Sequence, residues 1–70
     1  KKYKEALKVF QIISILFPDN SNCWHSLAEC SVIMMDKDQS LKCIEQGLKV
    51  NKSVDLVKPF LDLYQKALSL

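Results

Sequence analysis

The sequence predicts an all-α fold, arranged as an antiparallel helix-turn-helix solenoid. With 49% hydrophobic and 26% charged residues the chain is globular, not disordered. With only one Gly and two Pro, the chain has few of the residues that form tight turns between strands. Apolar residues instead recur at three- and four-residue steps, which is the period of an amphipathic helix. Residues typical of turns occur at Pro18, at "DKD" (36–38) and at "NKS" (51–53), and they divide the chain into four such segments.

The first predicted helix covers residues 1–17. Its apolar positions are Tyr3, Ala6, Leu7, Phe10, Ile13 and Phe17. Lysines occupy the other side near its start, at Lys1, Lys2, Lys4 and Lys8. Pro18 and the "DN" after it predict the end of this helix.

The second predicted helix runs from a cap at Asn20 or Ser21 to about Met35, because both residues are good N-caps. Its apolar stripe is Trp24, Leu27, Ala28, Val32 and Met35. As a large aromatic residue on this stripe, Trp24 is expected in the core.

The third and fourth predicted helices cover about 38–51 and a segment that starts at Ser53 or Asp55. Inward positions of the third are Leu41, Ile44, Leu48 and Val50. The fourth carries the apolar residues Val57, Phe60, Leu61, Leu63, Tyr64, Ala67 and Leu68. Pro59 is compatible with a helix because it falls near the first turn, where a missing N–H costs little.

Composition and hydropathy also exclude several function classes. The net charge of +2 comes from ten Lys without a single Arg, so specific nucleic-acid recognition is not expected. The longest nearly apolar stretch, 9–17, is too short to span a bilayer, and we expect a soluble, cytoplasmic protein. Because the sequence opens inside a helical pattern without Met, we expect it to be part of a longer chain.

Neither a catalytic nor a metal site is predicted. Cys23, Cys30 and Cys43 are expected to be free thiols that pack as small apolar residues. They contain no C-x-x-C pair, and His25 points away from Cys23 on a helix, so we expect no metal and no cofactor. His25 has no nucleophile or acid partner, and Asp36 and Asp38 are turn and cap residues. The chain is therefore predicted not to be an enzyme.

The sequence also resembles itself. Shifted by 34 residues, Leu7 meets Leu41 and Phe10 meets Ile44. Shifted by 36 residues, the fourth helix lies over the second, with Phe60 on Trp24. The helices therefore alternate between two types, in the order B-A-B-A.

A period of 34 residues made of two helices resembles the tetratricopeptide repeat. "WHSLAECS" supplies the Trp and Leu of its signature at the right spacing, "EALKVF" gives Ala6 and Phe10 in its A-x3-F slots, and Pro18 sits where the family closes its second helix. In the next unit Ser40, Ile44 and Lys52 depart from the pattern. The resemblance implies one segment, 1–70, divided into the second helix of an incomplete repeat (1–17), one full repeat (21–52) and a closing helix (53–70).

Such a solenoid implies two binding surfaces. The expected partner-binding groove, on the inner wall, contains Asn22, His25, Glu29, Val32, Ile33, Lys58, Leu61, Gln65 and Leu68. A second apolar contact face contains Val9, Ile12 and Ile15. Either an upstream helix or a partner chain would cover this second face, and a following capping helix is the alternative occupant of Val32, Ile33, Leu61 and Leu68.

Within that family the chain resembles the small type III secretion chaperones of the needle-subunit kind, through "CWHSLAEC" and "VDLVKPFLDLYQKAL". The resemblance implies a hetero-oligomer in which this chain buries a client's hydrophobic or amphipathic helix, with a small co-chaperone as a further partner. One alternative is a purely structural fragment of a larger scaffold or co-chaperone. Another is a membrane-surface helix formed by "KKYKEALKVFQIISILF".

Overall fold

Helix α1 (Tyr3–Leu16) lies within the first predicted helix, where apolar residues recur at three- and four-residue steps. The structure is a computed structural model that describes residues 3–70, so the predicted lysine face is described only from Lys4 onward, and Lys1 and Lys2 lie outside the described residues. Beyond the last helical residue, the amide of Phe17 still donates to the carbonyl of Ile13 at 2.8 Å. Pro18 then turns the chain, as the sequence predicts.

Helix α2 (Ser21–Ile33) begins at the predicted cap, because the Asn20 side chain accepts a hydrogen bond from the amide of Asn22 at 3.0 Å. It ends two residues before the predicted Met35. The prediction that Met35 belongs to the apolar stripe is wrong, since its side chain is 77% exposed. Met35 instead has a φ of 62° and forms the left-handed residue that reverses the chain after the helix.

Helix α3 (Lys37–Val50) is capped by Asp36, whose carboxylate accepts from the amide of Gln39 at 3.2 Å. A 3-10 turn, η1 (Val54–Leu56), leads into helix α4 (Val57–Leu68). Pro59 is the third residue of α4, where no intrahelical amide is required. The hydrogen bond from the amide of Gln39 to the Asp36 carboxylate confirms the predicted cap role of Asp36.

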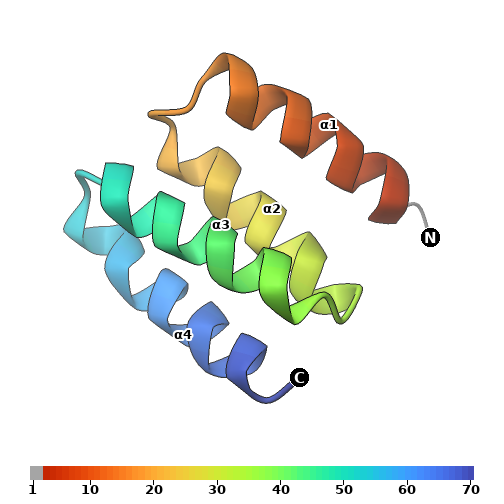
Figure 1. Ribbon diagram of the computed structural model, residues 1–70. Helices are drawn as coiled ribbons and strands as arrows, with labels where there is room; N and C mark the ends of the chain where they lie inside the picture. The colour runs from red at the N-terminus through yellow and green to blue at the C-terminus, as the bar shows by residue number, and fades with distance from the viewer. Residues whose placement is uncertain (1–2) are drawn as a thin grey trace.

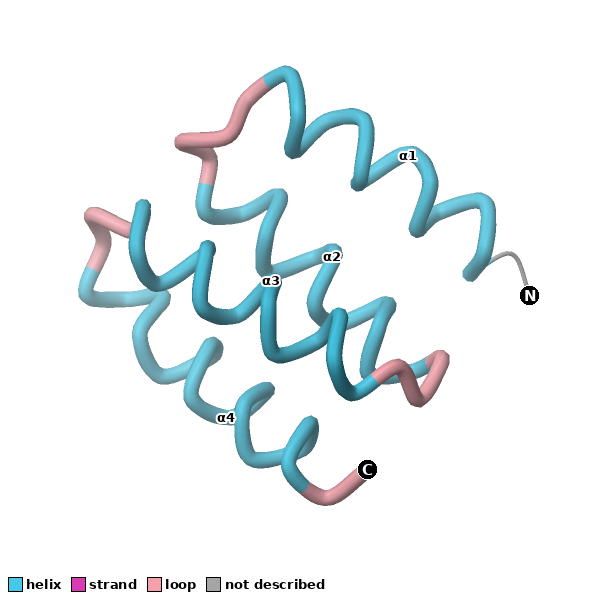
Figure 2. Tube along the Cα trace, in the orientation of Figure 1, coloured by secondary structure: helices cyan, strands magenta, loops and turns pink. Residues whose placement is uncertain are grey.

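The four helices run alternately in opposite directions, and α2 is the central one (Figure 1). It packs against α1, α3 and α4, while α4 also packs on α3. Within residues 3–70 the backbone of α1 comes close to that of α2 and to no other helix. Loops join the helices at both ends of the stack, and residues 3–70 contain no strand (Figure 2). The all-α fold predicted from the sequence is confirmed.

The core lies where α2, α3 and α4 meet. Its buried members are Leu27, Ala28, Cys43, Ile44, Phe60, Leu63 and Ala67. Two serines are buried among the helices, and their hydroxyls donate back to their own helix or cap. The Ser31 hydroxyl reaches the carbonyl of Leu27 at 2.9 Å, and that of Ser40 reaches the carbonyl of Asp36 at 2.6 Å. Both serines are fully buried and have their hydrogen-bonding needs met.

Three aromatic residues expected to face inward are less covered than predicted. Trp24 is half-buried against the core, and its indole N–H donates to the carbonyl of Pro18 at 2.8 Å. Tyr3 and Phe17 are exposed because the backbone of α1 lies close to a single neighbour, α2, so only one side of its apolar surface is covered.

No helix of residues 3–70 has both the length and the hydropathy needed to cross a membrane.

Candidate functional site

The structure divides the predicted groove residues into three groups. Asn22, Glu29, Lys58 and Gln65 are exposed polar side chains. Ile33, Leu61 and Leu68 are exposed apolar side chains. His25 and Val32 are half-buried. The nine residues therefore do not form one open wall.

His25 and Val32 help to hold the stack together. The His25 ring meets the ring of Phe60 edge to face, with centroids 5.2 Å apart and planes at 78°. Val32 packs against the buried core of α2, α3 and α4. Both side chains are therefore packing contacts and not part of the open groove that the sequence predicted.

The exposed apolar residues of α4 form a single row, which we call the α4 stripe. It consists of Val57, Leu61, Tyr64 and Leu68, whose side chains are 38–49% exposed. Their spacing of four, three and four residues places them on one face of the helix. This face borders the buried face of Phe60, Leu63 and Ala67.

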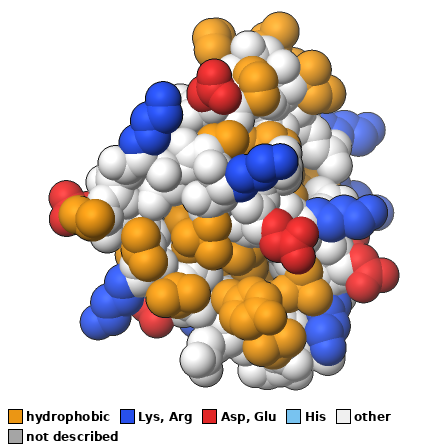
Figure 3. Space-filling view, turned by 60° about the vertical axis from the view of Figure 1, so that its left-hand side comes forward, with side chains coloured by type: hydrophobic (Ala, Val, Ile, Leu, Met, Phe, Trp, Pro, Cys, Tyr) orange, Lys and Arg blue, Asp and Glu red, His pale blue; other side chains and the backbone are white. Residues whose placement is uncertain are grey.

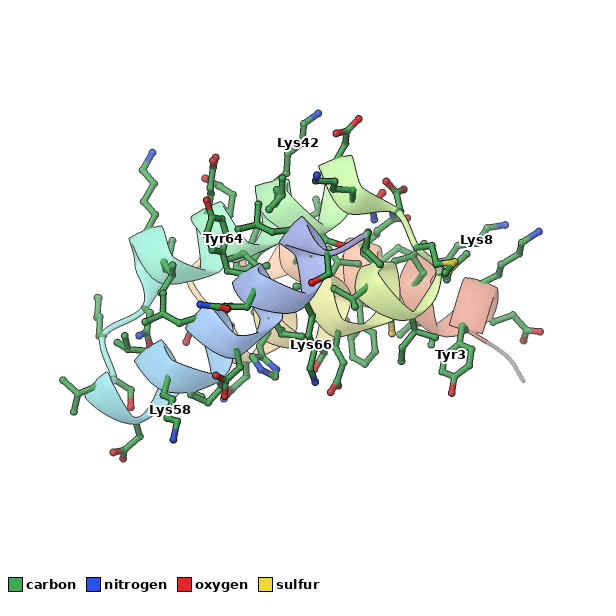
Figure 4. All side chains as sticks on the ribbon, turned by 90° about the horizontal axis from the view of Figure 1, so that it is seen from below. Tyr3, Lys8, Lys42, Lys58, Tyr64 and Lys66 are labelled. Carbon is green, nitrogen blue, oxygen red and sulfur yellow. The ribbon has the colours of Figure 1, made fainter. Side chains whose placement is uncertain are left out.

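Polar residues occupy the other side of α4. Lys58, Asp62, Gln65 and Lys66 are all exposed. Seen from below, Tyr64 lies on the side of α4 nearest α3, whereas Lys58 leaves the helix on the opposite side (Figure 4). Leu61 and Leu68 therefore belong with Val57 and Tyr64, and the inner wall between α2 and α4 is more polar than predicted.

A second exposed apolar row runs along α1. We call it the α1 ridge, and it consists of Val9, Ile12 and Leu16, at steps of three and four residues. The predicted exposure of Val9, Ile12 and Ile15 agrees with the structure, but Ile15 lies to one side of the ridge. Leu16 was not among the predicted contact residues, although its spacing from Ile12 could have identified it.

Hydrophobic side chains are concentrated at two heights of the molecule. In the space-filling view they gather at the top, where α1 lies, and across the lower part, at the height of α3 and α4 (Figure 3). Lysines and carboxylates surround both areas.

A groove that the sequence did not predict opens between α1 and α3, above α2. It has a volume of about 580 Å³. Ile15, Trp24, Leu27 and Cys43 form its apolar part. Its polar residues are Gln11, Ser14, Asp36, Asp38, Gln39 and Lys42. The periodicity of a single helix cannot show this groove, because the groove depends on the distance between two helices whose backbones do not come close to each other.

A more polar hollow of about 640 Å³ lies between the loop before α2 and the loop before α4. Asn22 of the predicted groove lines it, together with Asp19, Lys52 and Asp55. Opposite charges share this hollow, so it does not select strongly for either an anion or a cation.

The cysteines of the described residues are unpaired and placed as packing residues. Burial, with a smaller contribution from the charge of Asp36, raises the pKa of the Cys43 thiol to about 11. Burial and then Glu29 also raise the pKa of Cys30. Such thiols are poor nucleophiles near neutral pH. No group of three His, Cys, Asp or Glu side chains within 3–70 is placed to hold a metal ion.

Comparison with protein-family models, with curated proteins and with solved structures gave no match to this chain.

Proposed function

We propose that this chain is a protein-interaction module, without enzymatic activity, that binds the apolar face of an amphipathic helix along the α4 stripe. The observation that supports this most directly is the continuous row of Val57, Leu61, Tyr64 and Leu68. Alternating steps of four and three residues are the spacing with which one helix packs on another. Tyr64 also offers a hydroxyl at the edge of an otherwise apolar contact.

The finer assignment that we propose is a tetratricopeptide-like stack in the order B-A-B-A. In this scheme α1 is the second helix of an incomplete repeat, α2 and α3 form a full repeat, and α4 is the first helix of the next. Small residues at the close contacts support the assignment, since Ala28 and Ser40 are fully buried and Gly47 is also buried. The internal shifts of 34 and 36 residues support it independently.

The chaperone form of this proposal follows from the resemblance to needle-subunit chaperones. Here the client is a secretion-bound subunit whose assembly helix lies on the α4 stripe, and a small co-chaperone covers the α1 ridge in a cytoplasmic hetero-oligomer. The presence of two separate apolar rows, one on α1 and one on α4, is compatible with two partners.

A second candidate function is that of a structural segment in a larger scaffold. The exposed α1 ridge favours it, because a solenoid unit buries its apolar faces on its neighbours. In that case both apolar rows are packing surfaces for adjoining helical hairpins, and neither selects a free ligand.

A peptide titration tests the proposed function. The probes are a fluorescein-labelled amphipathic helix with Leu at the same four-three-four steps and a peptide of equal composition in scrambled order. We expect saturable anisotropy changes with the first probe and at least about tenfold weaker binding of the second, a difference of 1.4 kcal/mol.

Two substitutions of equal charge locate the binding surface. Leu61→Asp should weaken binding of the amphipathic peptide at least about tenfold. Gln65→Asp adds the same charge to the polar side of α4 and should leave the affinity nearly unchanged. Equal affinities for the two peptides, or for Leu61→Asp and the unmodified chain, would rule out the α4 stripe as the site.

A further inference from the structure

We propose that α1 is a hinged flap, which swings away from α2 as one unit while α2, α3 and α4 stay folded. The helices contribute unequally to the interior of the protein. Every member of the buried core cluster comes from α2, α3 or α4, whereas Ser14 is the only buried residue of α1. The α4 stripe takes no part in this motion, so the flap is independent of the proposed binding function.

Few interactions hold α1 in place. Among the described helices its backbone comes close to α2 alone, and it lies along one edge of the molecule (Figure 1). Leu7 and Phe10 pack against the core but are only partly buried. The Ser14 hydroxyl donates to the carbonyl of Gln11 at 2.8 Å, within α1 itself. Opening of α1 therefore exposes a limited apolar area and leaves the hydrogen bond of this serine intact.

The loop before α2 is suited to act as the hinge. The Trp24 indole N–H donates to the carbonyl of Pro18 at 2.8 Å, so this loop is attached to α2. Pro18 has no amide with which to continue a helix, and α1 ends at Leu16. The loop can therefore stay on α2 while α1 rotates away.

Cys30 lies beneath α1. Residues two positions apart on a helix point to nearly opposite sides. Ala28 and Val32, two positions to either side of Cys30, lie in the core of α2, α3 and α4 or pack against it. Cys30 is only 8% exposed and yet is not a member of that core. Of the helices close to α2, α1 is the one that remains to cover Cys30, so opening of α1 exposes this thiol.

Native-state hydrogen exchange of the full chain, followed by NMR at low urea concentrations, tests the flap. We expect the amides of Phe10 and Ile13 to have protection factors at least about tenfold lower than those of Ile44 and Leu63, and to depend less on urea, because opening α1 exposes less surface than global unfolding. The amides of Phe10 and Ile13 should also share one exchange free energy. Protection that rises residue by residue along α1 until it equals that of Ile44 would show fraying and would overturn the flap.

Two leucine truncations identify the unit that opens. Leu63→Ala removes a core side chain that the closed and the open states share, so it should lower protection in α3 and α4 at least about tenfold and leave protection in α1 unchanged. Leu7→Ala weakens only the closed state and should lower protection in every helix. Ile44→Val is a milder core truncation, to be used if circular dichroism shows that Leu63→Ala does not fold. An equal loss of protection in α1 and α3 on core truncation would show that α1 opens only with the whole fold.

Thiol labelling tests the same opening at Cys30. In a Cys23→Ser background, Leu7→Ala should speed the modification of Cys30 several-fold, because it makes opening of α1 more frequent. Leu63→Ala, or Ile44→Val in its place, should leave this rate nearly unchanged. Equal acceleration by Leu7→Ala and by the core truncation would mean that the reagent reaches Cys30 only through global unfolding, which contradicts the flap.

Discussion

The ring of Phe60 in α4 lies directly against the backbone of Gly47 in α3. A Cβ at Gly47 would overlap Cε1 and Cζ of this ring and would lie 3.1 Å from Cβ of Trp24 in α2. Phe60 is fully buried and has no open space into which its ring could move. The absence of a side chain at Gly47 therefore sets how closely α3 approaches both α2 and α4.

Gly47→Ala is expected to destabilise the protein, although alanine is the better helix former. Helix propensity favours alanine by up to about 1 kcal/mol, whereas overpacking a core costs about 1–3 kcal/mol. We expect a net loss in the free energy of unfolding, measured by urea denaturation with the fluorescence of Trp24. In a Phe60→Leu background the same substitution should cost less, because the smaller side chain leaves room. An equal cost in both backgrounds would show that Gly47 and Phe60 are not coupled.

Met35→Gly is expected to stabilise the protein by about 1 kcal/mol. Met35 has a φ of 62°, a conformation that costs a side chain with a Cβ but not glycine. The amide of Met35 donates to the carbonyl of Val32 at 2.9 Å, and that of Asp36 to the carbonyl of Ser31 at 2.9 Å, which closes α2 in a Schellman motif. The exposed methionine side chain loses little packing. Met34→Gly serves as the control and should destabilise, since Met34 has a φ of −84°.

The number and type of the helices could be predicted because local chemistry determines them. Asn20, Asp36 and Pro59 act within one turn of their own positions, and the apolar period of each segment is visible without knowledge of its neighbours. Helix ends were less predictable. A methionine at position 35 does not indicate a left-handed backbone conformation, because Gly or Asn more often occupies such a position.

The candidate site was predicted only in part, because periodicity identifies an apolar face but not what covers it. Leu61 and Leu68 were correctly expected to be exposed, yet they lie in one row with Val57 and Tyr64 and not on a wall shared with α2. Val32 has the same hydropathy and helical setting as an exposed valine. Its packing against the core is a tertiary contact, which the periodicity of α2 alone does not show.

Val32→Asp is expected to unfold the domain, although the sequence placed Val32 in the partner-binding groove. Val32 packs against the core, and a carboxylate there would be partly desolvated without a partner, at a cost of more than about 2 kcal/mol. Leu61→Asp lies on the exposed α4 stripe and should keep the helix content and most of the stability. Circular dichroism and urea denaturation of both variants check this contrast. Similar midpoints for the two variants would mean that Val32 is not part of the packed interior.

The three cysteines should differ in their rate of reaction with a thiol reagent. Cys23 is half-buried, whereas Cys30 and Cys43 are buried and have raised pKa values. At neutral pH we expect one fast modification, at Cys23, and slow modification of the other two through opening of the fold. Mass spectrometry of the Cys23→Ser variant should show loss of the fast phase alone. Fast labelling of Cys43 in that variant would contradict its position in the core.

The stability of the protein should fall as the pH rises from 9 to 11, in part because of Cys43. Burial, followed by the charge of Asp36, raises the pKa of this thiol from 9.0 to about 11. Between these values the unfolded chain has released the proton while the folded chain still holds it. The unfolded state therefore binds fewer protons, and the free energy of unfolding decreases with pH, whereas below pH 9 the contribution is complete. Because lysines and tyrosines also titrate in this range, the measured quantity is the difference between the unmodified chain and Cys43→Ala in urea denaturation. Cys43→Ala should be less stable below pH 9 and should lose less stability toward pH 11, and parallel pH profiles of the two proteins would contradict the raised pKa.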